Sequence, residues 1–219
     1  MKIARKTLVL AAGLFLTISA FGYFFWYKPT FNKPSKYYAF TYTLNEAEDK
    51  KETLLRLNKK STQARDYINE HGFDGEHCFL VDMRIPSGKN RFFVYYLNKD
   101  SVEMAGLVAH GSGITNSDTP VFSNTPNSYC TSLGKYKIGK SYNGKFGLAY
   151  KLYGLDKTNS KAFDRFVVLH AHACVPNDEV APLPICESWG CPTVSPAFLT
   201  RLQSYLDETT KPVMLWIYY

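Results

Sequence analysis

The stretch of sequence that decides the fold runs from residue 165 to residue 192 and reads RFVVLHAHACVPNDEVAPLPICESWGCP. Its first part, residues 165–172, is an apolar run that ends in two histidines, which predicts a buried strand leading into a polar site. Its last part places Cys191 directly after Gly190. A cysteine nucleophile needs a nearby base, and backbone N–H groups that face the oxyanion formed on attack. The stretch therefore predicts His170 as a base at a strand end and Cys191 as a nucleophile on a later loop.

Around this stretch the sequence predicts one mostly β domain with a few helices. The aromatic content of 16% suits half-buried strands better than long helices. Turn residues at 86–90 and 98–100 separate the first expected strands. Strands are expected at 78–83, 91–97, 102–110, around Tyr136, and at 148–152, 166–172 and 213–218.

Two helices are expected beside these strands. The first runs from Asn45, a suitable N-cap, to His71, and Gly72 ends it. Its charge-rich faces predict a solvated surface, and no catalytic or binding role is assigned to this helix. The second runs between Ser195 and Asp207, where Ser195 is the N-cap and apolar residues line one face.

The first 28 residues are predicted to be a targeting segment. Residues 8–27 carry no charge, and these 20 residues are about the length that crosses a hydrocarbon core as a helix. The basic residues before them predict a cytoplasmic N-terminus. Ala20–Gly22 is a candidate cleavage site, but the apolar run continues past it, so an uncleaved signal anchor is favoured over a signal peptide. A buried core helix is the alternative. Either form of targeting segment exports the rest of the chain.

Composition excludes two broad classes of protein. Among 219 residues, 45% are hydrophobic and 21% are charged, so a sizeable core can form and wholesale disorder is excluded. The net charge of +7 raises the question of nucleic acid as a partner. However, the first 28 residues hold four of the 26 basic residues and no acid, which leaves the remainder only slightly basic. Nucleic acid is therefore not expected as the main partner.

The cysteines allow more than one interpretation. The chain has five of them, and an odd number leaves at least one thiol without an intrachain partner in an oxidising compartment. Cys174 and Cys186 are candidates for a disulfide that closes the loop between base and nucleophile. A zinc site is the competing use, because zinc takes four histidine or cysteine ligands, although the sequence lacks a C-x-x-C pair here. The five candidate ligands are His170, His172, Cys174, Cys186 and Cys191.

Two further histidines lie near the candidate site in sequence. His172 is two residues after His170, so a regular strand places both on one side. His172 is accordingly a group that supports the base, the base itself, or a surface residue. His110 precedes a Gly-Ser-Gly turn and either lines the cleft or stabilises that turn.

Read together, an ordered series of segments resembles the L,D-transpeptidase catalytic domain family, in a divergent branch. The series spans residues 78–196, over half of the chain, and ends in Ser188–Pro192. Each segment alone is weak, and the ordered set is specific. The segments are LVDMR at 80–84, VAHGSG at 108–113, FSNTPNS at 122–128, SLGKY at 132–136, YNGKFG at 142–147, GLD at 154–156, VLH at 168–170 and SWGCP at 188–192.

The resemblance implies a fold, a reaction and a location. The fold is a mostly β, sandwich-like catalytic domain over residues 77–219, behind a stem and helical segment at 29–76 and the targeting segment at 1–28. By analogy with the family, Cys191 attacks the carbonyl between the third and fourth residues of a peptidoglycan stem peptide and releases the terminal D-residue. An amine then resolves the thioester to a cross-link, or water resolves it as a carboxypeptidase. The implied location is the periplasm, and the family implies no cofactor and no metal.

The resemblance also implies roles for individual residues. His170 accepts the thiol proton and returns it to the leaving amine. Ser188, Trp189 and Gly190 orient the site and shape the oxyanion position. This chain departs from commoner family members, which have His at position 189, Gly at 171 and Arg at 193. Without that Arg the substrate carboxylate loses its usual partner, and Arg165 is a candidate replacement. A third interpretation keeps the fold without activity, as an envelope-binding module with an inert Cys191.

Overall fold

The computed structural model describes Phe21, Tyr23, residues 36–114 and residues 119–219, with the backbone alone for residues 36–47. The chain divides into two compact units, residues 1–52 and 53–219. The predicted targeting segment and the stem at 29–35 lie outside the described residues, apart from Phe21 and Tyr23. Among the described residues, no helix combines the length and the apolar character that crossing a membrane requires.

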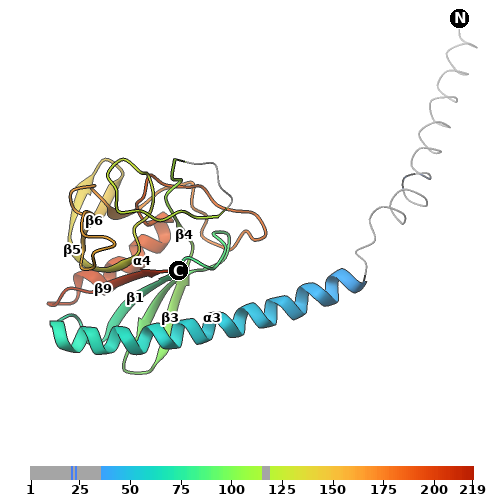
Figure 1. The fold of residues 1–219 in the computed structure, drawn as a ribbon, viewed down its shortest axis with the longest axis horizontal. Coiled ribbons are helices and arrows are strands. Elements are labelled where there is room, and N and C mark those ends of the chain that lie inside the picture. The colour runs from blue at the N-terminus through green and yellow to red at the C-terminus, as the bar shows by residue number, and fades with distance from the viewer. Residues whose placement is uncertain (1–20, 22, 24–35, 115–118) are drawn as a thin grey trace, which may run out of the picture. The chain divides into compact units, whose positions relative to one another are not determined.

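Within the described residues, the second unit is built on one nine-stranded sheet with the order β3-β2-β1-β9-β5-β6-β7-β8-β4. Its edge strands β3 and β4 are separated in sequence by Leu107 alone, so the sheet curls back toward itself (Figure 1). The prediction of a mostly β domain with a few helices is confirmed. The strands are β1 (His77–Asp82), β2 (Phe92–Tyr96), β3 (Ser101–Gly106), β4 (Val108–Ala109), β5 (Gly134–Gly144), β6 (Gly147–Gly154), β7 (Val168–Ala171), β8 (Thr193–Val194) and β9 (Met214–Tyr218).

The expected strand at 102–110 is two strands that pair with different neighbours. β3 pairs with β2, whereas β4 pairs with β8. The break falls after Gly106, where a Cβ atom would lie 2.5 Å from the Phe198 ring. β8 was not predicted, because two residues are too short to produce an alternating pattern.

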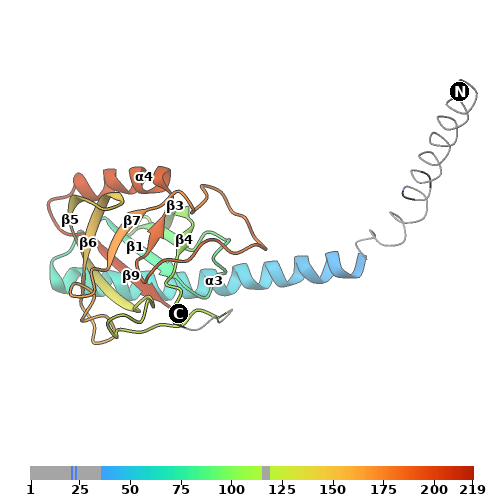
Figure 2. The same cartoon turned by 90° about the horizontal axis from the view of Figure 1, so that it is seen from above.

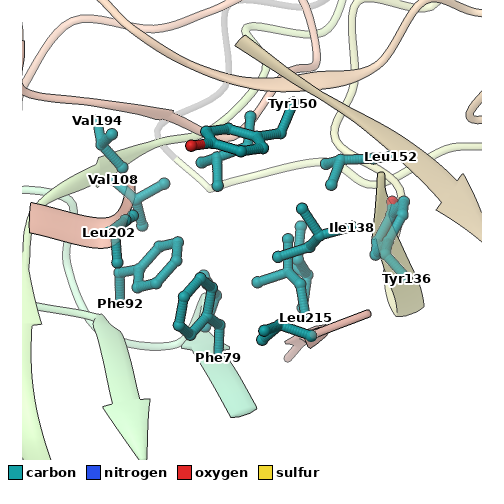
Figure 3. Packing of buried hydrophobic residues seen from close by; sticks show 14 of the residues in the cluster. Phe79, Phe92, Val108, Tyr136, Ile138, Tyr150, Leu152, Val194, Leu202 and Leu215 are labelled. Atoms are coloured by element: carbon teal, nitrogen blue, oxygen red, sulfur yellow. The ribbon is translucent and has the colours of Figure 1, made fainter. Parts of the chain in front are cut away.

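The main core lies on the inner face of the curled sheet. Aromatic and aliphatic side chains from β1, β2, β5, β6 and β9 face one another there (Figure 3). Helix α4 (Pro196–Asp207) closes this core with Phe198, Leu199 and Leu202. Its N-cap is Ser195, whose Oγ accepts the Phe198 N–H at 3.2 Å. The predicted position and cap of this helix are therefore confirmed.

Helix α3 (Lys36–His71) begins earlier than the predicted Asn45 and ends at the predicted residue. Gly72 follows with φ of +71°, a left-handed conformation that suits glycine. The expectation that this helix is only a solvated surface is wrong in part, because Leu57, Ala64 and Ile68 are buried against the outer face of the sheet. In the second unit, α3 and α4 thus cover opposite faces of the sheet (Figure 2).

Candidate active site

A cavity of about 540 Å³ lies where β7, β8 and the loop before β8 meet. Six of the eight residues predicted from the sequence line it, whereas Gly190 and His110 do not. The six are Cys191, His170, His172, Arg165, Ser188 and Trp189.

Parallel strands β7 and β8 bring the base and the nucleophile loop together. His170 on β7 is the register partner of Thr193 on β8, and Cys191 lies two residues before Thr193. The Thr193 Oγ1 atom lies 3.0 Å from His170 Nε2 and 3.3 Å from the Cys191 carbonyl oxygen. Sequence reasoning named Thr193 only as a departure from the family pattern, because its contact depends on a strand pairing across 23 positions.

The hydrogen bonds of His170 define its tautomer. Its Nδ1 atom lies 3.1 Å from the Ala171 carbonyl oxygen, which can only accept, so Nδ1 carries the proton and Nε2 is an acceptor. Burial lowers the pKa of His170 below its ordinary 6.5, and the charge of nearby His172 lowers it further, while the Ala171 hydrogen bond opposes them. The imidazole is therefore neutral near pH 7, and Nε2 carries no proton.

The Cys191 thiol is bonded to the backbone at the start of β7. Its sulfur accepts the Val168 N–H at 3.5 Å, and its S–H donates to the Phe166 carbonyl at 3.8 Å. Burial raises the pKa of Cys191 above 9.0, while the Val168 N–H and the Arg165 guanidinium act in the opposite direction. A thiol and a neutral imidazole are therefore the resting pair. Both groups are uncharged because desolvation disfavours the charged form of each.

One side chain and one glycine shape the nucleophile loop. Ser188 Oγ donates to the Cys191 carbonyl at 2.6 Å and accepts the Gly190 N–H at 3.1 Å. Gly190 has φ of +111°, and a Cβ atom there would lie 2.8 Å from the Cys130 carbonyl oxygen. Ser188 therefore holds the loop, and the group that orients the imidazole is the Ala171 carbonyl. In the described part of the chain, the N–H groups of Trp189 and Cys191 have no hydrogen-bond partner.

Arg165 supports the loop that packs behind Gly190. Its guanidinium donates to the carbonyls of Ser123 at 2.9 Å and Cys130 at 2.7 Å, and to the hydroxyls of Ser128 and Ser132. Thr131, on the same loop, donates to the Gly190 carbonyl at 3.3 Å. These four bonds use the N–H groups of both terminal nitrogens of Arg165, so this residue is poorly placed to bind a substrate carboxylate through them. Lys145 is another cation that lines the cavity.

The two other histidines are bound in ways that distinguish them from His170. His172 Nδ1 accepts the Cys174 N–H at 3.1 Å, so its Nε2 carries the proton in the neutral form. His110 Nδ1 accepts from Arg91 at 2.9 Å, and burial, followed by the Arg91 charge, lowers the pKa of His110 to about 4. The His110 carbonyl accepts the Ser188 N–H at 2.8 Å. His110 thus anchors the nucleophile loop from behind the cavity.

The cysteines do not assemble the zinc ligands of the competing interpretation. Cys174 and Cys186 form a disulfide, as their positions in the sequence suggested, while Cys78, Cys130 and Cys191 are free. The disulfide removes two of the five candidate ligands. Over residues 36–114 and 119–219, no group of three or more His, Cys, Asp or Glu side chains is arranged to hold a metal ion. The reactive groups at the cavity are therefore the Cys191 thiol and the His170 imidazole.

Comparisons with known proteins identify the family of the chain. The family model of the L,D-transpeptidase catalytic domain matches residues 39–218. No curated protein matches the sequence.

Three solved structures illustrate how distant the similar proteins are. The helical cell shape determining protein Pgp2 from Campylobacter jejuni is 12% identical, with 65% of this chain and 47% of that chain covered and a TM-score of 0.44. Bd1075 from Bdellovibrio bacteriovorus is 14% identical, with 67% and 49% covered and a TM-score of 0.42. An L,D-transpeptidase from Xylanimonas cellulosilytica is 12% identical, with 70% and 68% covered and a TM-score of 0.38.

The matched region of this chain spans about half the length of Pgp2 and of Bd1075. The family model, in contrast, matches well over half of the sequence and includes both His170 and Cys191. The chain therefore belongs to the L,D-transpeptidase catalytic domain family.

Proposed function

We propose that this protein processes peptidoglycan stem peptides as an L,D-transpeptidase, through a thioester on Cys191. One observation supports the proposal most directly. Three groups belong to residues that line one cavity: the Cys191 thiol, the Cys191 backbone N–H, which has no hydrogen-bond partner among the described residues, and the His170 imidazole with its acceptor nitrogen. These are the three groups that acyl transfer through a cysteine requires.

In the proposed reaction, the Cys191 S–H turns from the Phe166 carbonyl toward His170 Nε2. The imidazole takes the proton as the sulfur attacks the carbonyl between the third and fourth residues of the stem. The Cys191 N–H donates to the developing oxyanion, and the Trp189 N–H is a second candidate donor. The imidazolium then protonates the leaving amine, the terminal D-residue departs, and the thioester remains on Cys191.

Resolution of the thioester repeats the same proton transfers. An incoming amine or water gives up its proton to His170 as it attacks the thioester, and the thiol is regenerated. An amine yields a cross-link, and water yields a trimmed stem. We assign the base role to His170 rather than His172, because the neutral form of His172 presents a protonated Nε2.

Thr193 is assigned the role of positioning His170. In the resting site its hydroxyl donates to the neutral Nε2 at 3.0 Å. When the hydroxyl turns its proton to the Cys191 carbonyl, 3.3 Å away, the Nε2 lone pair is free to take the thiol proton. For the carboxylate of the departing D-residue we assign Lys145, because the donors of Arg165 are already bonded.

The proposed location is the periplasmic side of the cell envelope. The predicted targeting segment supports it, either as an uncleaved anchor in the inner membrane or as a cleaved signal peptide. The Cys174–Cys186 disulfide supports it independently, because such bonds persist in oxidising compartments.

Incubation with a defined disaccharide-tetrapeptide, followed by mass spectrometry of the products, tests the proposal. The expected products lack the terminal D-residue, and a cross-linked dimer forms when an amine resolves the thioester. Cys191→Ser should give neither product, whereas Cys78→Ala should give both, because Cys78 is buried in the core beneath α3. Substrate that binds and returns unchanged would replace the proposal with the inert binding module.

A further inference from the structure

The mouth of the cavity is surrounded by exposed aromatic side chains that the proposed chemistry does not use. Tyr129 is 46% exposed, Phe146 53%, Trp189 79% and Phe166 84%, and all four line the cavity. Within the described residues, none of them belongs to an apolar core cluster. Large aromatic side chains gathered in solvent around one opening indicate a binding surface.

Two of these rings are held outward by an unfavourable backbone conformation. Tyr129 has φ of +54° and Phe166 has φ of +55°, in the left-handed region that bulky residues rarely adopt. The backbone of both residues is hydrogen-bonded in this conformation. The Tyr129 carbonyl accepts the Gly113 N–H at 3.2 Å, and the Phe166 N–H donates to the Phe163 carbonyl at 3.0 Å. Strain of this kind persists where the surroundings fix it, and it gathers at ligand sites.

The other two rings connect this rim to the nucleophile and the base. Trp189 belongs to the nucleophile loop, and its ring centroid lies 6.0 Å from that of Tyr129. Phe146 stacks on the His170 imidazole with a centroid distance of 5.1 Å. A ligand that covers these rings therefore lies directly beside the reacting thiol.

The chemistry between the rings indicates what that ligand is. Exposed Lys145, Asp164 and Glu187 line the same cavity, so the lining combines apolar ring faces with charged hydrogen-bonding groups. A lipid chain would leave these charges without partners. A pyranose ring with an N-acetyl group matches both the aromatic rings and the charged side chains. Its C–H face packs on an aromatic ring, while its hydroxyl and amide groups bond to polar side chains.

We propose that Tyr129, Phe146, Phe166 and Trp189 form a saccharide subsite for N-acetylated amino sugars. The inference rests on the proposed function, and it specifies the substrate as a stem peptide still linked to its glycan. The sugar ring lies on the aromatic rim while the peptide enters the cavity toward Cys191. A free stem peptide, which carries no sugar, makes no contact with this part of the binding surface.

Direct binding of a sugar without a peptide tests the subsite apart from any reaction. Calorimetric titration of the full chain with tetra-N-acetylchitotetraose should give saturable binding, and Phe166→Ala should raise its Kd at least tenfold. Phe163→Ala is the matched control, because Phe163 is a 45% exposed phenylalanine that does not line the cavity. Trp189→Ala provides a second variant should Phe166→Ala fail to fold. Absence of saturable binding, or equal weakening by Phe163→Ala, would overturn the proposal.

A kinetic comparison separates the failure of this inference from the failure of the proposed function. The kcat/KM for a disaccharide-tetrapeptide should exceed that for the free tetrapeptide at least tenfold, and Phe166→Ala should bring the ratio close to one. Equal kcat/KM values in the unmodified protein would refute the saccharide subsite and leave the proposed function standing. Sugar binding without turnover of either substrate would refute the proposed function and leave the subsite standing.

Discussion

The Thr193 hydroxyl lies 3.0 Å from His170 Nε2, on the neighbouring parallel strand. Both residues are buried, so the hydroxyl is bound to the imidazole rather than to water. Its second contact, 3.3 Å away, is the carbonyl of the candidate nucleophile Cys191. One threonine therefore links the base strand to the nucleophile loop.

Thr193→Val should slow acylation of Cys191 by roughly 2- to 10-fold, the effect of about 0.5–1.5 kcal/mol for one net hydrogen bond. Valine keeps the shape of threonine and leaves the imidazole without its partner. Thr193→Ser keeps the hydroxyl and should recover most of the rate. Stopped-flow measurement of acylation provides the rates, and equal rates for valine and serine would exclude the positioning role.

A carbapenem should acylate the purified protein at Cys191, as the family resemblance implies. Intact-mass spectrometry should detect one adduct, which Cys191→Ser abolishes. Cys78→Ala is the matched control and should retain the adduct. An adduct that persists in Cys191→Ser would remove this residue from the nucleophile role.

His170→Ala should slow this acylation by roughly 10²- to 10⁴-fold, the usual contribution of a general base. His172→Ala should have a much smaller effect, because the His172 Nδ1 atom accepts the Cys174 N–H and its Nε2 carries the proton. His170→Ala should also slow thiol alkylation near neutral pH more than His172→Ala does. The reverse order of the two variants would transfer the base role to His172.

Alkylation of Cys191 by iodoacetamide should keep accelerating as the pH rises past 9. Burial raises the pKa of this thiol above 9.0, so the reactive thiolate fraction still increases in that range. Cys191→Ala gives the background from the buried Cys78, whose pKa burial raises to about 12, and from Cys130. A rate plateau that begins below pH 7 would instead indicate a resting thiolate–imidazolium pair.

Replacing both Cys174 and Cys186 by Ser should lower the free energy of unfolding by about 3 kcal/mol. The disulfide closes a separation of 12 residues between the base strand and the nucleophile loop, and its loss releases that segment in the unfolded chain. Urea denaturation provides the measurement. Cys78→Ala, which leaves the disulfide intact, serves for comparison, and an equal loss there would argue against the cross-link as the cause.

Local patterns in the sequence predicted those features that depend on neighbouring residues. The helix after Ser195 was predicted because its cap bonds a residue three positions away. Most strands and the end of α3 were predicted in the same way, from alternation and from Gly72. Most of the site residues predicted from the segment 165–192 also line the cavity, because the chemistry-bearing groups of this segment are few.

The tertiary structure alone decided which of these groups touch. The pairing of β7 with β8 brings Thr193 to His170, and the bonds of Arg165 to a loop more than thirty residues away occupy its donors. The burial of Leu57, Ala64 and Ile68 likewise depends on a sheet face built from strands far along the chain. The neutral resting states of Cys191 and His170 have the same origin, since desolvation is set by everything that packs around a group and not by its sequence neighbours.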